Sequence, residues 1–170
     1  MTVDASKGAY ITNATAVPLV LTNSNVGKGR LMESVGYIAP TAAAEAASTY
    51  RFCRVPSNGR ISQVLLSAAD FTTAGAIDIG IYQTADYGGA VVDRDLFASA
   101  GDLSAAAGVV LGDFNLAHES GEYTFAEAEK PLWEVLGLTA DSHRDYDVVA
   151  YVTTAFNGGQ PMLMKVRYTV

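Results

Sequence analysis

Cysteine and charge are both scarce in this sequence. Cys53 is the single cysteine among 170 residues, so no disulfide can form within the chain and a disulfide-based fold is excluded. Asp, Glu, Lys and Arg make up 17% of the residues, compared with about 25% in an ordinary soluble domain. No apolar run approaches the roughly 18 residues of a membrane-spanning helix. Residues 1–7 lack the basic and apolar regions of a secretory signal, so we expect neither a membrane span nor a signal peptide.

Positive charge is scarcer than negative charge. The chain has 11 Lys and Arg against 18 Asp and Glu, which gives a formal net charge of -7 and a pI of about 4.6. The basic residues are scattered without a run, whereas nucleic-acid binding needs a basic patch that displaces counterions from phosphates. We therefore expect no nucleic acid and no membrane among the partners.

Apolar and small residues take the place of charge. Hydrophobic residues make up 49% of the chain, which is enough for a core and argues against intrinsic disorder. A length of 170 residues indicates one domain, with room for an arm. The abundance of Ala, Gly, Thr and Val is typical of β-sandwiches and of proteins that bury surface in assemblies.

Strand signals recur at short intervals from Tyr50 onward. Ile77, Ile79 and Ile81 alternate with other residues at a period of two. In the last stretch, one face would hold Met162, Met164, Val166, Tyr168 and Val170. Further strands are expected at 50–55, 61–67 and 147–154, with weaker candidates at 109–111, 113–116 and 123–125. No strand is followed by a long amphipathic helix, which disfavours a parallel α/β fold.

Two short helices are expected between the strands. Asp93 is placed to cap a helix that runs through Ala100 and ends at Gly101. Pro131 suits the first turn of a second helix, which Gly137 ends.

Together these signals predict an all-β fold, a jelly-roll-like antiparallel β-sandwich with an extended N-terminal arm and one or two short helices. We place the arm and an Ala-rich connector at residues 1–48 and the sandwich at residues 49–170. The arm has two short β-capable pieces separated by turn-forming residues. They are Tyr10-Ile11-Thr12-Asn13 and Pro18-Leu19-Val20-Leu21.

The stretch ADYGGAVVDRD, with three aspartates around a double glycine, is a candidate calcium site. A helix-loop-helix calcium loop needs oxygen ligands at positions 1, 3 and 5, glycine at 6 and glutamate at 12. Counted from Asp93, the pattern fails after Asp95. We interpret Gly88-Gly89 as a turn and Asp93 as a helix cap, and an irregular calcium site at Asp86, Asp93 and Asp95 stays open.

Catalytic and zinc motifs are missing. Cys53 lies in an alternating strand, where a small buried thiol is the usual case. His118 and His143 form no local ligand pair for zinc, and each would be a general base only if a serine and a carboxylate converged on it. Asp145 and Asp147 are expected to share one face of a strand. They could form half of a carboxylate site, or they could lie in solvent at the start of the strand. We predict no enzyme activity, no metal and no cofactor.

Five stretches of the chain resemble one family. They are KGAYITN, YRFCRVPSNGRISQVLLSAAD, AIDIGIYQTADYGGAVVDRDLFASAGDLS, EKPLWEVLGLTADSHRDYDVVAYV and LMKVRYTV. Together they resemble the capsid decoration proteins of tailed bacteriophages, also called cement or head-stabilising proteins. The resemblance implies a jelly-roll domain that docks on the outside of the icosahedral shell. It implies no catalytic residue, because the family offers no catalytic motif.

On this resemblance we expect a virion protein, made in the bacterial host cytoplasm, that binds the major capsid protein and itself, as a homo-dimer or homo-trimer. The arm suits this role because an extended segment can pair with a neighbour's sheet edge. We therefore expect partner contacts in the arm, at Tyr10, Ile11, Thr12, Asn13, Leu19 and Leu21. Low charge allows large contact areas without desolvating many ions.

Two alternatives stay open. An adhesin-like carbohydrate-binding module would need a platform of surface aromatics such as Tyr87, Tyr146 and Trp133. An esterase-like hydrolase would use His118 or His143 as its base. Fold class cannot choose among these functions, because jelly rolls host all of them.

Overall fold

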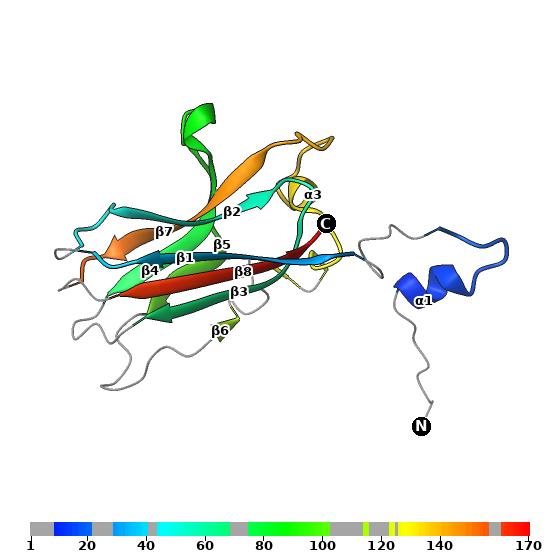
Figure 1. Cartoon of the computed structure of the whole chain (residues 1–170), viewed down its shortest axis with the longest axis horizontal. Helices are drawn as coiled ribbons and strands as arrows, with labels where there is room; N and C mark the ends of the chain where they lie inside the picture. The colour runs from blue at the N-terminus through cyan, green and yellow to red at the C-terminus, as the bar shows by residue number, and fades with distance from the viewer. Residues whose placement is uncertain are drawn as a thin grey trace, which may run out of the picture.

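The computed structural model describes residues 9–21, 29–40, 44–68, 75–102, 114–115, 123–124, 126–156 and 161–170. Within this part of the chain, two layers of strands lie face to face, and the helix α1 (Ala9–Ala14) lies beyond one end of them (Figure 1). None of the helices among these residues has the length and apolar character needed to span a membrane.

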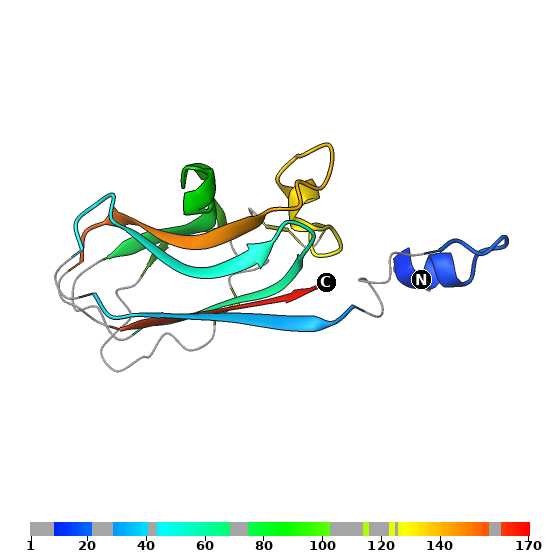
Figure 2. The same ribbon diagram turned by 45° about the horizontal axis from the view of Figure 1, so that its top comes forward.

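The described residues form eight strands in two antiparallel sheets, which Figure 2 shows as separate layers. One sheet has the order β1-β8-β3-β6 and the other has the order β2-β7-β4-β5. The strands are β1 (Leu31–Ile38), β2 (Thr49–Pro56), β3 (Arg60–Ala68), β4 (Ala76–Gln83), β5 (Val91–Asp102), β6 (Phe114–Asn115), β7 (Asp145–Thr154) and β8 (Met162–Thr169). The predicted all-β sandwich is confirmed.

The pairing pattern of these strands is that of a jelly roll. β1 pairs with β8, β2 with β7, β3 with β6 and β4 with β5, each pair antiparallel. This pattern arises when the two halves of the chain form one long hairpin that rolls up, so that successive strands alternate between the sheets except at the central hairpin of β4 and β5. Two further ladders, β3 with β8 and β4 with β7, close the rolled hairpin into sheets.

The core lies between the two sheets, where the inward faces of the strands meet. On β8, Met162, Met164 and Val166 are buried while the residues between them are half-exposed, which confirms the predicted period of two. Phe97 and Tyr123 pack with their ring centroids 5.4 Å apart. The Tyr123 hydroxyl donates to a backbone carbonyl of β3 at 3.0 Å, so this buried polar group is satisfied.

The arm is shorter than the predicted 1–48, because Leu31–Ile38 form β1 and belong to the sandwich. β1 pairs with β8 along its whole length, from Leu31↔Thr169 to Ile38↔Met162. Its partner lies at the far end of the sequence, and no local pattern reveals such a pairing. The connector also contributes to the sandwich, since Ala44 is buried and its backbone bridges to Phe156.

Strand β5 replaces the helix predicted from Asp93 to Ala100. These residues pair with β4, and the register moves from Ile79↔Ala98 to Ile81↔Asp93. β5 thus takes up extra residues between two successive partners, as a β-bulge does. The bulge interrupts the alternation and gives the apolar residues a helix-like spacing, which explains why the prediction was wrong. Asp93 lies within a strand and caps no helix.

The second predicted helix and the double-glycine turn are confirmed. Helix α3 (Leu132–Val135) begins after Pro131, and Gly137 follows its end with a φ of 71°. Gly88, with a φ of 87°, turns the chain after the short 3-10 helix η1 (Ala85–Tyr87). Both glycines adopt the left-handed conformation that other residues avoid.

Of the weaker strand candidates, one is present as a short strand. Phe114–Asn115 form β6 inside the predicted 113–116. Residues 123–124 form no strand. Residues 109–111 lie outside the described residues.

The two sheets meet closely along the edge where β1 lies over β2. A Cβ atom added to Gly36 would lie 2.0 Å from the carbonyl oxygen of Phe52. Next to this point the Cys53 thiol donates to the Ser34 carbonyl at 3.3 Å. Glycine is therefore required at position 36 because the backbones of the two sheets touch there.

Gly36→Ala should destabilise the protein by about 3 kcal/mol or prevent folding, because the two strand backbones must separate to admit the methyl group. Urea unfolding measures the change. Gly101→Ala is the matched control: its Cβ would make ordinary contacts with the Ile77 carbonyl oxygen at 3.4 Å and Ala98 Cβ at 3.9 Å, and should cost less than about 1 kcal/mol. Equal stabilities of the two variants would contradict the close approach.

Candidate interaction surfaces

The outer face of the sheet β2-β7-β4-β5 carries a network of arginine–aspartate pairs. Asp147 on β7 is 6% exposed, and its carboxylate accepts hydrogen bonds from Arg51 Nη1 at 3.0 Å and Arg54 Nε at 2.8 Å. Arg94 Nε on β5 lies 2.8 Å from the buried Asp78 Oδ2 on β4. Because each acid is buried and each guanidinium is half-exposed, the charges are neutralised where the sheet meets water.

The same arginines also lie over tyrosine rings. The Arg51 guanidinium is 5.6 Å from the ring centroid of Tyr82, and that of Arg94 is 4.9 Å from the centroid of Tyr151. Such cation–π contacts add to the ion pairs. The outer face of this sheet, called the polar face below, is therefore a connected layer of paired polar groups.

The outer face of β1 and β8 is apolar by comparison. Leu31, Val35 and Tyr37 project from alternate positions of β1 and are exposed, Tyr37 to 65%. The charged pair between them is neutralised, because Arg167 Nε on β8 donates to Glu33 Oε2 at 2.7 Å. This surface, called the β1–β8 face below, is an exposed apolar stripe of the kind that marks interaction sites.

Sequence reasoning missed the β1–β8 face because it assigned this stretch to the arm. The signal was present: Leu31, Val35 and Tyr37 alternate at a period of two with Met32 and Ile38 on the other side. Read as a strand, this alternation predicts two apolar faces, of which a sandwich can cover one.

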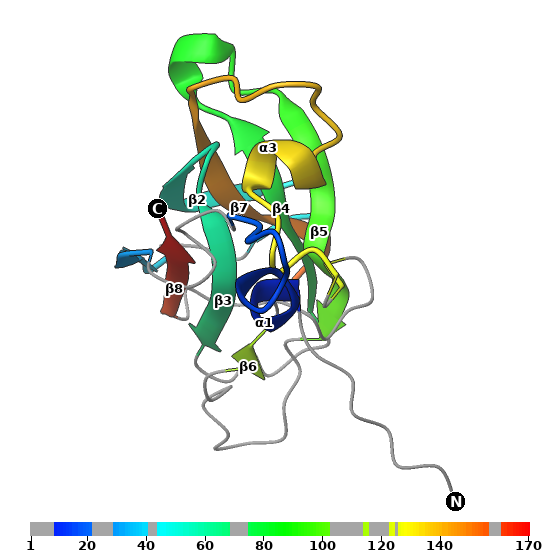
Figure 3. The same ribbon diagram turned by 90° about the vertical axis from the view of Figure 1, so that its right-hand side faces the viewer.

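The arm carries a second exposed apolar surface. After α1, Val17, Leu19, Val20 and Leu21 are all exposed, Val17 to 97% and Leu21 to 88%. Residues 9–21 contain no charged side chain. Figure 3, which looks along the long axis, and Figure 1 together place α1 beyond the end of the sandwich. An uncharged segment that exposes four large aliphatic side chains is poorly suited to contact with water alone.

The six predicted contact residues all lie in this arm, and their roles stay predictions. Tyr10, Ile11, Thr12 and Asn13 lie in α1, so the strand form predicted for them is wrong. Backbone carbonyls of this helix accept hydrogen bonds from within the same segment, as in the bond from Thr15 N to Ile11 O at 3.1 Å. The helix therefore offers no free strand edge for strand addition. Leu19 and Leu21 lie in neither a helix nor a strand and are exposed.

Cys53 is a buried packing residue of β2, as predicted. Burial raises the pKa of its thiol, although a hydrogen bond with Ser34 acts in the opposite direction. The thiol is therefore protonated at neutral pH, and the thiolate that nucleophilic catalysis requires is not formed there.

The remaining candidates for chemistry do not converge. His143 is exposed, with Nδ1 3.2 Å from Asp141 Oδ2, and His118 lies outside the described residues. Asp86 is on η1 whereas Asp93 and Asp95 are on β5. Among the described residues, no three His, Cys, Asp or Glu side chains gather as metal ligands do.

Two further readings from the sequence are corrected by burial. Asp147 is not a solvated strand start, because its carboxylate is buried under two arginines; only Asp145 of that pair is exposed. Tyr146 is 6% exposed and packs in the core, while Tyr87 is exposed on η1 and Trp133 is half-buried within α3. These three rings therefore form no common sugar-binding platform.

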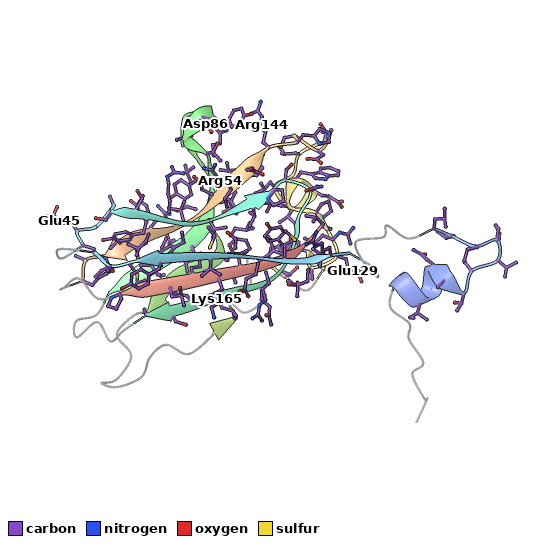
Figure 4. The ribbon with its side chains drawn as sticks, viewed as in Figure 1. Glu45, Arg54, Asp86, Glu129, Arg144 and Lys165 are labelled. Atoms are coloured by element: carbon purple, nitrogen blue, oxygen red, sulfur yellow. The ribbon has the colours of Figure 1, made fainter. Side chains whose placement is uncertain are left out.

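A polar hollow of about 250 Å³ lies at one end of the sandwich, where η1, β2 and the segment before β7 meet. Figure 4 shows Asp86 on η1 and Arg144 on that segment at the same end, with Arg54 of β2 below them. This surface is called the loop-end hollow below. Its lining consists of Arg54, Thr84, Asp86, Tyr87, His143, Arg144 and Asp145.

The wall of the loop-end hollow is held in place by the buried Ser57. Its hydroxyl donates to Asp141 Oδ1, its oxygen accepts from Arg144 N at 3.2 Å, and its backbone N donates to Arg144 O at 2.8 Å. His143 N also donates to Asp141 Oδ1, at 2.9 Å. The bonds from the Ser57 hydroxyl and from His143 N lower the pKa of Asp141. The loop that carries His143 and Arg144 is thus fixed to the β2–β3 turn.

Comparison with known proteins identifies one likeness of fold. No family model matches the sequence, and no curated protein matches it either. Among solved structures, a chain of the cyanophage Pam1 capsid asymmetric unit is similar, with a TM-score of 0.55 and 15% sequence identity. The superposition covers 92% of this chain and 96% of that chain, so the likeness concerns the whole fold.

Asp141→Asn should destabilise the protein by about 1 to 2 kcal/mol at pH 7, because hydrogen bonds to a charged carboxylate are lost. The folded-state pKa of Asp141 is depressed, so its contribution is complete above about pH 4 and disappears as the pH falls through the folded value. Urea unfolding from pH 7 to pH 2.5 should show the two proteins converging in acid. Asp145→Asn, at an exposed carboxylate, is the control. A difference that persists undiminished at pH 2.5 would rule out this assignment.

Proposed function

We propose that this chain is a structural protein of a phage capsid, which decorates and stabilises the icosahedral shell as an oligomer bound outside the major capsid protein. The observation that carries the proposal is the likeness, over 92% of this chain, to a chain of the cyanophage Pam1 capsid asymmetric unit. Jelly rolls host many functions, so the surfaces of the molecule have to supply the rest of the argument.

The arm and the β1–β8 face have the properties of partner-binding surfaces. Both expose large aliphatic or aromatic side chains. Among their charged groups, Glu33 and Arg167 pair with one another, so Lys165 on β8 is the charge that a contact would have to desolvate. The centre of a stable interface is depleted in charge in the same way. We assign the contacts with the major capsid protein and with further copies of this chain to these two surfaces.

The polar face has the properties of a surface that stays in water. Its buried acids are already neutralised by arginines of the same chain, so a partner would gain little by pairing with them. The net charge of -7 would limit self-association between neighbouring particles. We therefore propose that the polar face points away from the shell.

The proposed role depends on many weak contacts instead of one strong one. A shell presents the same binding position many times, and an oligomer that engages several positions gains from the high effective concentration. Such a role needs no catalysis, cofactor, nucleic acid or membrane. It would be fulfilled on the virion after synthesis in the bacterial cytoplasm.

Removal of residues 1–22 should leave the sandwich folded and weaken binding to capsids by roughly tenfold or more, because the apolar arm contacts are lost. Binding is measured by cosedimentation with capsids that lack this protein, and folding by thermal unfolding.

A second variant separates the arm's side chains from its length. Val17→Ser, Leu19→Ser and Leu21→Ser together keep the full chain and should weaken binding to a similar extent. Glu45→Gln, an exposed change on the connector, is the control and should bind as the unchanged protein does. Full decoration by the truncated protein would exclude the arm as a contact.

A further inference from the structure

The loop-end hollow is lined by charged groups that the ion pairs of the described residues leave wholly or partly unpaired. Arg144, Asp86 and Asp145 are absent from the ion pairs of the described part of the chain. Arg54 donates to Asp147 from Nε, and this bond leaves its two terminal nitrogens available. The pKa of Arg54 is raised first by its hydrogen bond and charge interaction with Asp147, and the charges of Asp145 and Asp86 add to this rise. Opposite charges thus line one hollow without pairing with one another.

A buried hydroxyl in the same wall also lacks a partner. Thr84 is 2% exposed, and its Oγ1 has no hydrogen-bond partner among the described residues. Leaving a buried polar group unpaired is costly, and native structures do so rarely. A valine would fill the same volume without that cost. The presence of threonine here points to a hydrogen bond that the isolated chain does not make.

The charges of the hollow restrict the class of ligand. A simple anion such as phosphate would be repelled by Asp86 and Asp145, and a simple cation would be repelled by Arg54 and Arg144. The polar lining does not suit an apolar molecule. A hydroxyl group donates one hydrogen bond and accepts others, so a polyhydroxyl ligand can use the carboxylates and the guanidiniums at once.

We propose that the loop-end hollow binds one sugar ring of a glycan. Arg54 and Arg144 donate to ring hydroxyls, and Asp86 and Asp145 accept from them. Tyr87, whose ring has the Arg144 guanidinium 4.2 Å from its centroid, supplies an exposed aromatic edge. The hollow has a volume of about 250 Å³, slightly below the range of about 300–1,000 Å³ for sites of drug-sized ligands. This volume suits a ligand as small as a single sugar ring. The site goes beyond the capsid role and does not depend on it.

The test is a titration of the ¹⁵N-labelled full chain with single sugars, followed by the amide signals. The panel contains galactose, glucose, N-acetylglucosamine and glucuronic acid, with inorganic phosphate and glycine betaine as probes for an anion site and a zwitterion site. We expect at least one sugar to shift the amides of Thr84, Gly88 and Arg144 with a dissociation constant of about 1 to 10 mM, since one ring makes few contacts.

Three variants decide whether the shifts come from this site. Arg144→Ala and Asp86→Asn should each weaken binding by about tenfold. Thr84→Val should weaken it several-fold while raising the unfolding temperature by a few degrees, because it removes an unpaired buried hydroxyl. A threonine with a purely structural role would not combine these two effects. Lys165→Ala, on the β1–β8 face, is the control and should bind unchanged.

The outcomes separate the proposal from its competitors. Binding of phosphate or betaine alone would overturn it in favour of a different ligand. Sugar shifts that survive Arg144→Ala would place the sugar elsewhere and also overturn it. If no sugar shifts these amides, the proposal is overturned, and the unpaired charges would then serve a contact with a protein. None of these results bears on capsid binding, which the arm variants test separately.

Discussion

The sandwich depends on the insertion of β8 between β1 and β3. β8 pairs with β1 along one edge and with β3 along the other, and its Met162, Met164 and Val166 fill the centre of the core. This arrangement joins the last strand of the chain to the first, and backbone bonds between Arg30 and Val170 extend it by one residue. The arm therefore leaves the sandwich beside β8, next to the β1–β8 face (Figure 1).

The rolled hairpin also separates the surfaces of the molecule by chemistry. β1 and β2 follow one another in the chain but lie in different sheets, and they touch where Gly36 meets Phe52. The β1–β8 face and the arm are apolar, whereas the opposite sheet presents neutralised arginine–aspartate pairs. The loop-end hollow lies at a third place, where η1, β2 and the segment before β7 meet.

The errors of sequence reasoning in this chain have identifiable physical causes. The helix expected from Asp93 to Ala100 fails because a β-bulge in β5 imitates helical spacing. Tyr10 and its neighbours have β-capable side chains, yet the segment makes local helical bonds, and none of the described strands pairs with it. The solvated position expected for Asp147 fails because two arginines from another strand cover it.

By itself, the sequence determined the period-two strands of the core, the turn at Gly88, the helix after Pro131 and the low charge that suits an assembly. These features depend on neighbouring residues, so local rules suffice. Only the tertiary structure decided that Leu31–Ile38 join the sandwich, that Asp147 is buried, and that Arg54, Asp86 and Arg144 line one hollow. Each of these depends on pairing between strands far apart in the chain. The spacing of residues along one segment does not predict such long-range pairing.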